Sequence, residues 1–119
     1  MKNIFLIDFE NIACSFTSFS LLKETKENDI IYLFINDSSL NYLPKIMALL
    51  KACKAKIVFQ YCKGTCKINM DIHIANSIGD LLHNVEKIEY LYIVSQDHGY
   101  DGIINYFSDR YQIKRIDSF

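Results

Sequence analysis

Five short runs of consecutive apolar residues constrain the fold of this chain more than any other feature. They lie at residues 3–7, 30–35, 56–61 and 90–94, with a weaker one at 112–116. In the first four runs, at least three apolar residues occupy consecutive positions and do not alternate with polar ones. A strand buried on both faces has this pattern, which is typical of a parallel sheet covered by helices on each side.

Segments with the periodicity of a helix separate the runs. Residues 40–52 and 69–84 carry apolar side chains at steps of three and four, and Pro44 falls in a first turn, where a helix tolerates it. Shorter helices are expected at residues 19–25 and 100–108. This alternation predicts one α/β domain over residues 1–119, a doubly wound sheet of five parallel strands with helices on both faces.

The composition excludes several other classes of protein. A chain of 119 residues can form one hydrophobic core, and a single Pro, four Gly and 50% hydrophobic residues do not fit a disordered or collagen-like chain. No apolar run reaches the ~18 residues of a membrane span. Asp8 and Glu10 interrupt the first run too early for a signal peptide. We therefore expect a cytoplasmic protein that does not contact a membrane.

Basic side chains are concentrated in one segment, although the net charge of the chain is only −1. Residues 51–67 contain five Lys, among them Lys63 and Lys67, and no acidic residue. The segment is either a solvated helix face followed by a loop or a patch that attracts phosphate groups.

The Cys residues do not form a complete metal-binding pattern. Cys62 and Cys66 have the spacing of half a zinc site, but no second pair of Cys or His follows at a suitable distance. Cys14 and Cys53 resemble small hydrophobic residues in their surroundings. Free thiols in a reducing compartment are therefore expected at these positions.

Acidic residues follow several of the predicted strands. Right-handed crossovers place the carboxyl ends of parallel strands on one edge of the sheet, where ligands bind. That edge would receive Asp8 and Glu10 after the first strand, Asp71 in the first turn of a long helix, Asp97 after the fourth strand, and Asp101 at the start of the next helix.

Carboxylates gathered at one edge repel one another, and a bound cation is the usual remedy. Oxygen ligands suit Mg²⁺ or Mn²⁺ better than zinc. Next to a Lys patch, such a cation indicates phosphate chemistry, and the sequence contains neither a glycine-rich phosphate loop nor a dinucleotide-binding motif. Each acid also has a structural interpretation, as a strand end, an Asx turn or a favourable charge at a helix N-terminus.

Residues 4–12, 67–75 and 93–101 carry acidic motifs after two predicted strands and in a predicted helix. These three segments resemble PIN-like nucleases of the NYN type and a related bacterial PIN-like ribonuclease subgroup. Residues 4–12, IFLIDFENI, form an apolar strand that ends in Asp-x-x-Asn. Residues 67–75, KINMDIHIA, are similar to the subgroup's Lys-Asn-Ala-Leu-Asp-Phe-His pattern, with Ile68 in place of the Asn. Residues 93–101, IVSQDHGYD, match its Ser-x-Asp-x-Gly-Phe-Asp stretch, and Gly99 stands where many NYN relatives carry a second Asp. The segments arrive in the family order and span nearly the whole chain.

The resemblance implies a sheet of strand order 3-2-1-4-5 and a metal-dependent endoribonuclease that cleaves single-stranded RNA. Asp8, Asp71, Asp97 and Asp101 would form its catalytic acidic site and hold Mg²⁺ or Mn²⁺. The nucleic-acid-binding and orienting residues would be Asn11, which orients Asp8 or a water, Ser95, which bonds to a neighbouring carboxylate, and Lys67, with Lys63 in the basic segment before it. Arg110, Lys114 and Arg115 would also attract the phosphate backbone.

Other functions stay open at this point. The main alternative is a non-catalytic nucleic-acid-binding or protein-interaction module that retains the PIN-like fold. A receiver-like phospho-acceptor would need a Lys at the end of the last strand, whereas Lys114 lies within it. DNA is a second candidate substrate, and eight Phe with eight Tyr leave room for an apolar surface that binds a second copy or a protein regulator.

Overall fold

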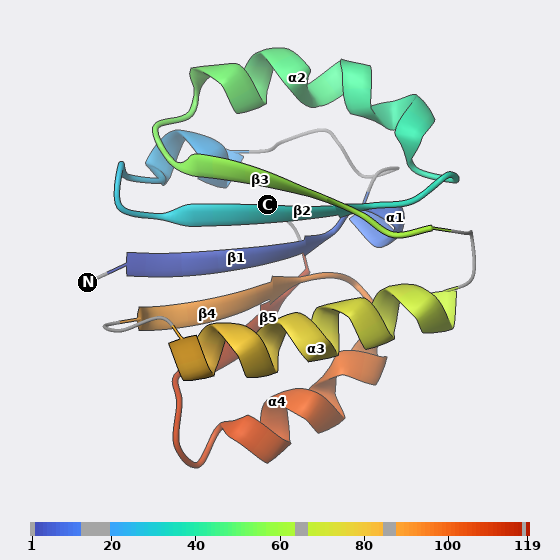
Figure 1. Ribbon diagram of the computed structural model, residues 1–119. Coiled ribbons are helices and arrows are strands. Elements are labelled where there is room, and N and C mark those ends of the chain that lie inside the picture. Colours follow the sequence, from blue (N-terminus) through green and yellow to red (C-terminus); the bar gives the residue numbers. More distant parts are fainter. Residues whose placement is uncertain (1, 13–19, 64–66, 85–87, 118) are drawn as a thin grey trace.

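Five strands form one parallel sheet in the computed structural model, which describes residues 2–12, 20–63, 67–84, 88–117 and 119 (Figure 1). The strands are β1 (Lys2–Asp8), β2 (Ile30–Ile35), β3 (Lys56–Tyr61), β4 (Ile88–Val94) and β5 (Ile113–Ile116). Their order is β3-β2-β1-β4-β5, and every neighbouring pair is parallel. Both the predicted fold class and the predicted strand order are confirmed.

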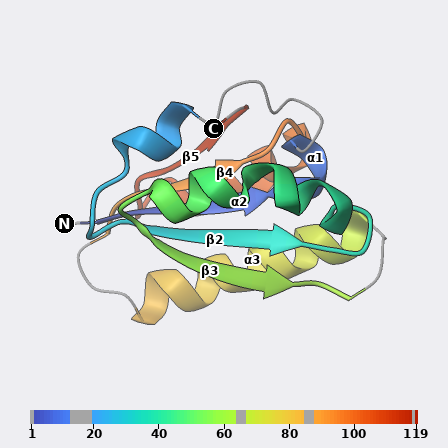
Figure 2. The ribbon, with the colours of Figure 1, turned by 90° about the horizontal axis from the view of Figure 1, so that it is seen from above.

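Helices cover both faces of the sheet, as Figures 1 and 2 show. One face carries α1 (Phe9–Ile12), the 3₁₀ turns η2 (Ser20–Glu24) and η3 (Leu40–Tyr42), and α2 (Leu43–Ala52). The other carries α3 (Lys67–Asn84), η4 (His98–Tyr100) and α4 (Asp101–Phe107). The order of the strands reverses between β1 and β4, so the carboxyl ends of these two strands border the crevice in which α/β sheets bind ligands.

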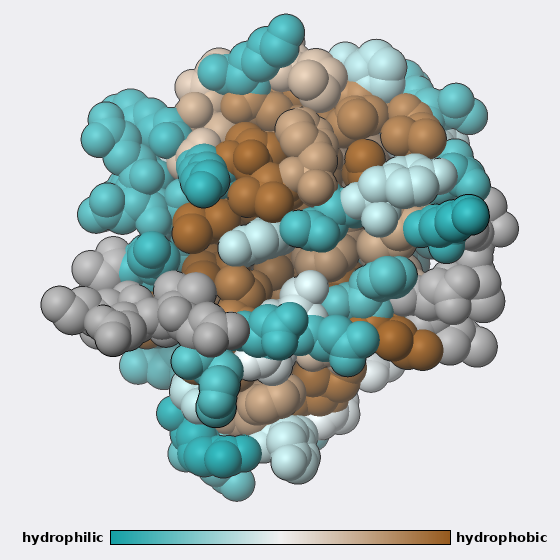
Figure 3. Space-filling view, in the orientation of Figure 1, coloured by the Kyte–Doolittle hydropathy of each residue, from teal (hydrophilic) through white to brown (hydrophobic). Residues whose placement is uncertain are grey.

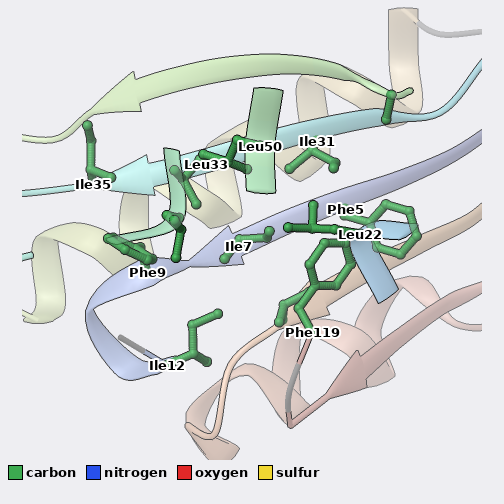
Figure 4. Close-up of a cluster of buried hydrophobic side chains, with 13 residues drawn as sticks. Phe5, Ile7, Phe9, Ile12, Leu22, Ile31, Leu33, Ile35, Leu50 and Phe119 are labelled. Carbon is green, nitrogen blue, oxygen red and sulfur yellow. The ribbon is translucent and has the colours of Figure 1, made fainter. Parts of the chain in front are cut away.

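The hydrophobic core consists of two clusters, one on each side of the sheet. Side chains of β1 point alternately into both, which is why Ile4 to Ile7 are all buried. The first cluster packs α2, η2 and Phe119 against β1 and β2 (Figure 4). The second packs α3 and α4 against β1, β4 and β5. Each fully buried aliphatic or aromatic side chain contributes about 1.5–3 kcal/mol to this core.

Helix α3 begins two residues earlier than the predicted boundary. Its buried stripe contains Met70, Ile74, Ile78 and Leu81, at the predicted steps of three and four. Because the helix starts at Lys67, Asp71 lies in its second turn and the expected place in the first turn is wrong. Asp71 therefore does not serve as a favourable charge at the helix N-terminus, where such charges act within the first turn.

Short elements account for the other differences from the sequence prediction. The predicted helix at 19–25 is the 3₁₀ turn η2, and the helix at 40–52 divides into η3 and α2, with Pro44 in the first turn of α2 as expected. Helix α1, four residues long, was not predicted. Within the described residues, no helix combines the length and apolar character needed to cross a membrane.

Candidate active site at the carboxyl edge of the sheet

Asp8 lies at the centre of a hydrogen-bond network at the end of β1. Its side chain is fully buried. Its Oδ2 atom accepts hydrogen bonds from Asn11 Nδ2, from Ser95 Oγ at 3.2 Å and from Tyr100 Oη at 3.1 Å. Burial raises the pKa of Asp8, the three hydrogen bonds lower it, and the charge of Asp71 raises it further. The resulting pKa of Asp8 is above the ordinary value for Asp, which means that the site disfavours the charged form of this carboxylate.

The local sequence explains why these donors reach Asp8. Asn11 lies three residues after Asp8, in the helical turn α1, and this spacing brings the two side chains to the same side. Phe9 and Ile12 anchor the turn, because both are buried in the core. Ser95 arrives from the neighbouring strand: Ile7 pairs with Val94, so the next residue on each strand lies beside the other.

Asp71 brings a second carboxylate to Asp8. It lies three residues before Ile74 and so shares the helix face that packs on the sheet. The hydroxyl of Tyr100 interacts with both acids, and burial together with their two charges raises its pKa. Asp8 Oδ1 and Asp71 Oδ1 are both buried without a hydrogen-bond partner. In the described part of the chain, the only other buried side-chain oxygen or nitrogen without a partner is Asn3 Oδ1, at the other end of β1.

This pair of oxygens fits a divalent cation. Buried carboxylate oxygens without a donor are costly, and a cation between them would satisfy both. Oxygen ligands suit Mg²⁺ or Mn²⁺, and Mg²⁺ usually binds one or two carboxylates and keeps several waters or phosphate oxygens. Among the described residues, no three His, Cys, Asp or Glu side chains gather around a common point. The cluster of four carboxylates implied by the resemblance is thus not assembled in this conformation.

Asp97 serves as a cap for the turn that follows β4. It is the N-cap residue of η4, and its Oδ1 accepts a hydrogen bond from the backbone N–H of Gly99 at 2.9 Å. A Cβ atom at position 99 would lie 3.1 Å from this oxygen, which favours glycine there. The N–H of Asp97 donates to Ser95 Oγ at 3.0 Å, and Ser95 in turn donates to Asp8. Asp97 therefore connects to Asp8 through Ser95.

Asp101 is paired with basic side chains. Arg115 Nε donates to Asp101 Oδ1 at 2.9 Å, and His98 Nδ1 lies 3.1 Å from Oδ2. These contacts, that of Arg115 first, hold the pKa of Asp101 below its ordinary value. Arg115 also bonds to Asp117 and, at 3.0 Å, to the backbone oxygen of Ser95. The Arg115 side chain is only 13% exposed and connects β5 to the end of β4. The sequence predicted that Arg115 attracts phosphate groups, whereas in the structure it binds these protein groups.

Other predicted residues are distributed over α1, the segment after β3, α3 and β5. Glu10 accepts a hydrogen bond from Asn36 Nδ2 at 2.7 Å, which ties α1 to the end of β2. Lys63 is exposed immediately after β3. Lys67 begins α3, but its side chain lies outside the described part of the structure. Lys114 lies over the ring of Tyr90, 5.0 Å from its centroid.

The cysteines in the described residues are free thiols. Cys53 is partly buried, and Cys62 is buried in the second core cluster. Burial, and to a lesser degree the charge of Asp8, raises the pKa of the Cys62 thiol. Cys14 and Cys66 lie outside the described residues.

Tyr100 and Arg115 are partners of the acids that were not expected from the sequence. A signal existed for Tyr100, because the resembling motif has Phe at this position and Tyr adds the hydroxyl that reaches Asp8. No local sequence pattern predicts the contact of Arg115 with Asp101, because the two residues are 14 positions apart. A cavity of about 270 Å³, lined by Asn3, Asp29 and Tyr92 among others, lies at the opposite end of the strands and is separate from this site.

Comparison with known proteins agrees with this architecture. A family model described as a PIN domain matches residues 2–116. No curated protein and no solved structure matches the chain at a significant level. PIN domains are generally metal-dependent nucleases that act on nucleic acids and usually use divalent ions such as Mg²⁺ or Mn²⁺. Because the match spans the whole sheet and all of its helices, the chain belongs to the PIN domain family.

Proposed function

We propose that this protein is an endoribonuclease of the NYN type that cleaves single-stranded RNA with the help of Mg²⁺ or Mn²⁺. One observation carries the proposal: Asp8 and Asp71 each have a buried carboxylate oxygen without a hydrogen-bond partner. Asp71 also raises the pKa of Asp8. Two adjacent acids that repel each other are a poor choice for stability alone, and they are a suitable pair of ligands for a cation.

Asp8 and Asp71 would hold the ion through these oxygens. When bound, the ion supplies a water of lowered pKa and stabilises the charge that develops on the phosphorus. Asn11, Ser95 and Tyr100 hold the other oxygen of Asp8, and this restricts the direction in which Oδ1 points. Such supporting hydrogen bonds tune the affinity of a metal ligand.

Asp97 and Asp101 would act around this pair. The backbone N–H of Asp97 donates to Ser95 Oγ, and the Asp97 carboxylate caps the turn that holds this N–H in place, so the turn positions the hydroxyl that supports the ligand. Asp101 would complete the site only after its contacts with Arg115 and His98 open, because both of its oxygens are engaged. RNA entering along the basic segment would be attracted by exposed lysines, and this gives salt-sensitive binding with little sequence preference.

A cleavage assay on labelled single-stranded RNA tests the proposal. Purified protein would be incubated with Mn²⁺, Mg²⁺ or EDTA, beside the variants Asp8→Asn and Asp71→Asn, with a DNA strand of the same sequence as a second substrate. Asp109→Asn is the matched control, because Asp109 is an exposed acid after α4. We expect ion-dependent cutting that is lost in the first two variants and retained in the control.

Two results would contradict the proposal. Cutting that persists in EDTA would remove the divalent ion from the mechanism. RNA binding without any cutting, in every ion tested, would favour the non-catalytic nucleic-acid-binding module.

A further inference from the structure

Strand β3 exposes two aromatic rings at the edge of the sheet. Phe59 is 45% exposed and Tyr61 is 53% exposed. They lie two residues apart, so both side chains point to the same face, the one on which Ile57 packs against the first core cluster. Figure 3 shows apolar side chains over α2, β2 and β3, in the upper part of the view. Apolar area of this kind at a surface marks a binding site more often than scattered single residues do.

We infer that Phe59 and Tyr61 form a stacking platform for two successive bases of single-stranded RNA, an inference that rests on the proposed function. Residues two apart on a strand are separated by ~6.6 Å along it, close to the length of one nucleotide in an extended strand. Aromatic side chains at such a spacing can each stack on one base, without regard to which base it is.

The ring of Tyr61 is held in place before any ligand binds. Its hydroxyl donates a hydrogen bond to Asp37, which lies in the turn after β2. This contact restricts the rotation of the side chain. A ring already oriented loses less conformational entropy when a base stacks on it.

The charges around the platform favour a polyanion. Lys54 is exposed before β3 and Lys63 is exposed after its end, two residues from Tyr61. Lys56 is also exposed but points to the other face of the sheet, and Asp37 is the acid that bonds to Tyr61. A second copy of this chain is a less suitable occupant. Antiparallel pairing of two β3 edges centred on Phe59 would place Lys56 of each copy opposite residue 62 of the other, next to Lys63, and like charges there repel.

The platform lies near the carboxyl end of β3, and the acids lie at the carboxyl end of β1. Asp8 pairs with Phe34 and Phe34 with Gln60, so Gln60 lies in the same row as Asp8, two strands away. Neighbouring strands are ~4.8 Å apart, which places this row within about 10 Å of Asp8. Asp8 and Asp71 point to the other face, that of the second core cluster, so RNA stacked on Phe59 and Tyr61 would pass over the carboxyl ends of β2 and β1 to reach them.

Binding measured without cleavage tests the platform. In EDTA, fluorescence anisotropy would compare two labelled RNA strands of equal length and charge, an oligoadenylate and one in which abasic nucleotides replace the bases. We expect wild type to bind the oligoadenylate more tightly. Phe59→Ala and Tyr61→Ala should each weaken that binding about tenfold and leave binding of the abasic strand unchanged. Tyr61→Phe, which keeps the ring, should retain most of the affinity.

Tyr106→Ala is the matched control, because Tyr106 is 68% exposed on α4 and lies in a different element. Melting curves of each variant would show that the fold is retained. Equal wild-type affinity for the two strands, absence of RNA binding, or unchanged affinity in Phe59→Ala and Tyr61→Ala would each overturn the inference. A dimer that dissociates in these variants while RNA affinity stays the same would assign the edge to a second copy and also overturn it.

Cleavage in Mn²⁺ is a separate measurement. Base-dependent binding that needs both rings, with no cutting, would support the platform and remove the nuclease. Cutting with no difference between the two strands in binding would keep the nuclease and remove the platform.

Discussion

The hydroxyl of Tyr100 lies 3.1 Å from Oδ2 of Asp8, although the two residues are 92 positions apart in the sequence. Asp8 closes the central strand, and Tyr100 ends the 3₁₀ turn that leads into α4. The Tyr100 ring is 1% exposed and belongs to the second core cluster. One side chain thus fills the core with its ring and supports an acid of the candidate site with its hydroxyl.

Removing this hydroxyl should slow cleavage more than it affects folding. In Tyr100→Phe we expect RNA cleavage to fall by about tenfold, because a residue that supports a metal ligand typically changes activity by 10–100-fold. Stability should fall by only about 1 kcal/mol, the usual contribution of one hydrogen bond. Single-turnover rates over a series of Mn²⁺ concentrations would measure the first effect. Tyr32→Phe, in a partly buried tyrosine of the same cluster, is the control, and equal rates in both variants would contradict the role of Tyr100.

Binding of a divalent ion should stabilise wild type through Asp71. At an ion concentration about 100 times Kd, a ligand that binds only the folded state adds ~2.7 kcal/mol. In Asp71→Asn this gain should disappear, and the variant in EDTA should melt at or above the wild-type temperature because the repulsion with Asp8 is removed. Thermal melting with and without Mn²⁺ checks both statements. A large loss of stability in EDTA would instead show that Asp71 is a structural residue.

Asp101 should stabilise the folded protein at neutral pH and lose this effect in acid. Arg115 and His98 lower the pKa of Asp101 in the folded state, whereas the unfolded value is about 3.9. The stabilisation by this group is therefore present above about pH 4 and is lost as the pH falls through the lower folded value. Urea unfolding of wild type and Asp101→Asn should show the largest difference in stability near neutral pH and a smaller one in acid. A difference that stays constant with pH would contradict this assignment.

Two isoleucines of α3 should respond very differently to truncation. Ile74 is fully buried in the second core cluster, and Ile72 is 53% exposed on the same helix. Ile74→Ala should cost about 2–5 kcal/mol, because it removes buried methyl groups and leaves a cavity. Ile72→Ala should change stability by less than about 0.5 kcal/mol, as surface substitutions usually do. Urea denaturation compares the two, and similar losses would mean that α3 is docked in a different rotation.

Strands and long helices were predictable because each shows its own spacing of apolar residues, consecutive in the strands and at steps of three and four in the helices. The runs at residues 30–35 and 56–61 coincide with β2 and β3. In β2, which lies between two other strands, burial leaves an uninterrupted apolar signature. Strand β3 lies at the edge of the sheet and is largely exposed, so the expected burial of this run on both faces is wrong. Helix α1 was not predictable in this way. Its four residues are too few to show a period, and it forms because Phe9 and Ile12 pack into the core.

The candidate site was predictable in position and less so in its contacts. Topology alone brings Asp8 and Asp97 to one edge of the sheet, and the stripe of α3 turns Asp71 toward it. Pairing between Arg115 and Asp101 depends on the tertiary position of a four-residue strand, which no local pattern specifies. Periodicity identifies which residues approach an edge, and packing decides which of them meet.

The two hydroxyls that hold Asp8 come from residues 95 and 100, after nearly all of the sheet has been made. A chain emerging from the ribosome carries Asp8 and Asp71 long before it carries Ser95 and Tyr100. Until residues 95 and 100 are in place, Asp8 has only one of its three donors, Asn11. Under the proposed function, the order of synthesis therefore leaves the candidate site incomplete until residue 100 has been made and has folded into place.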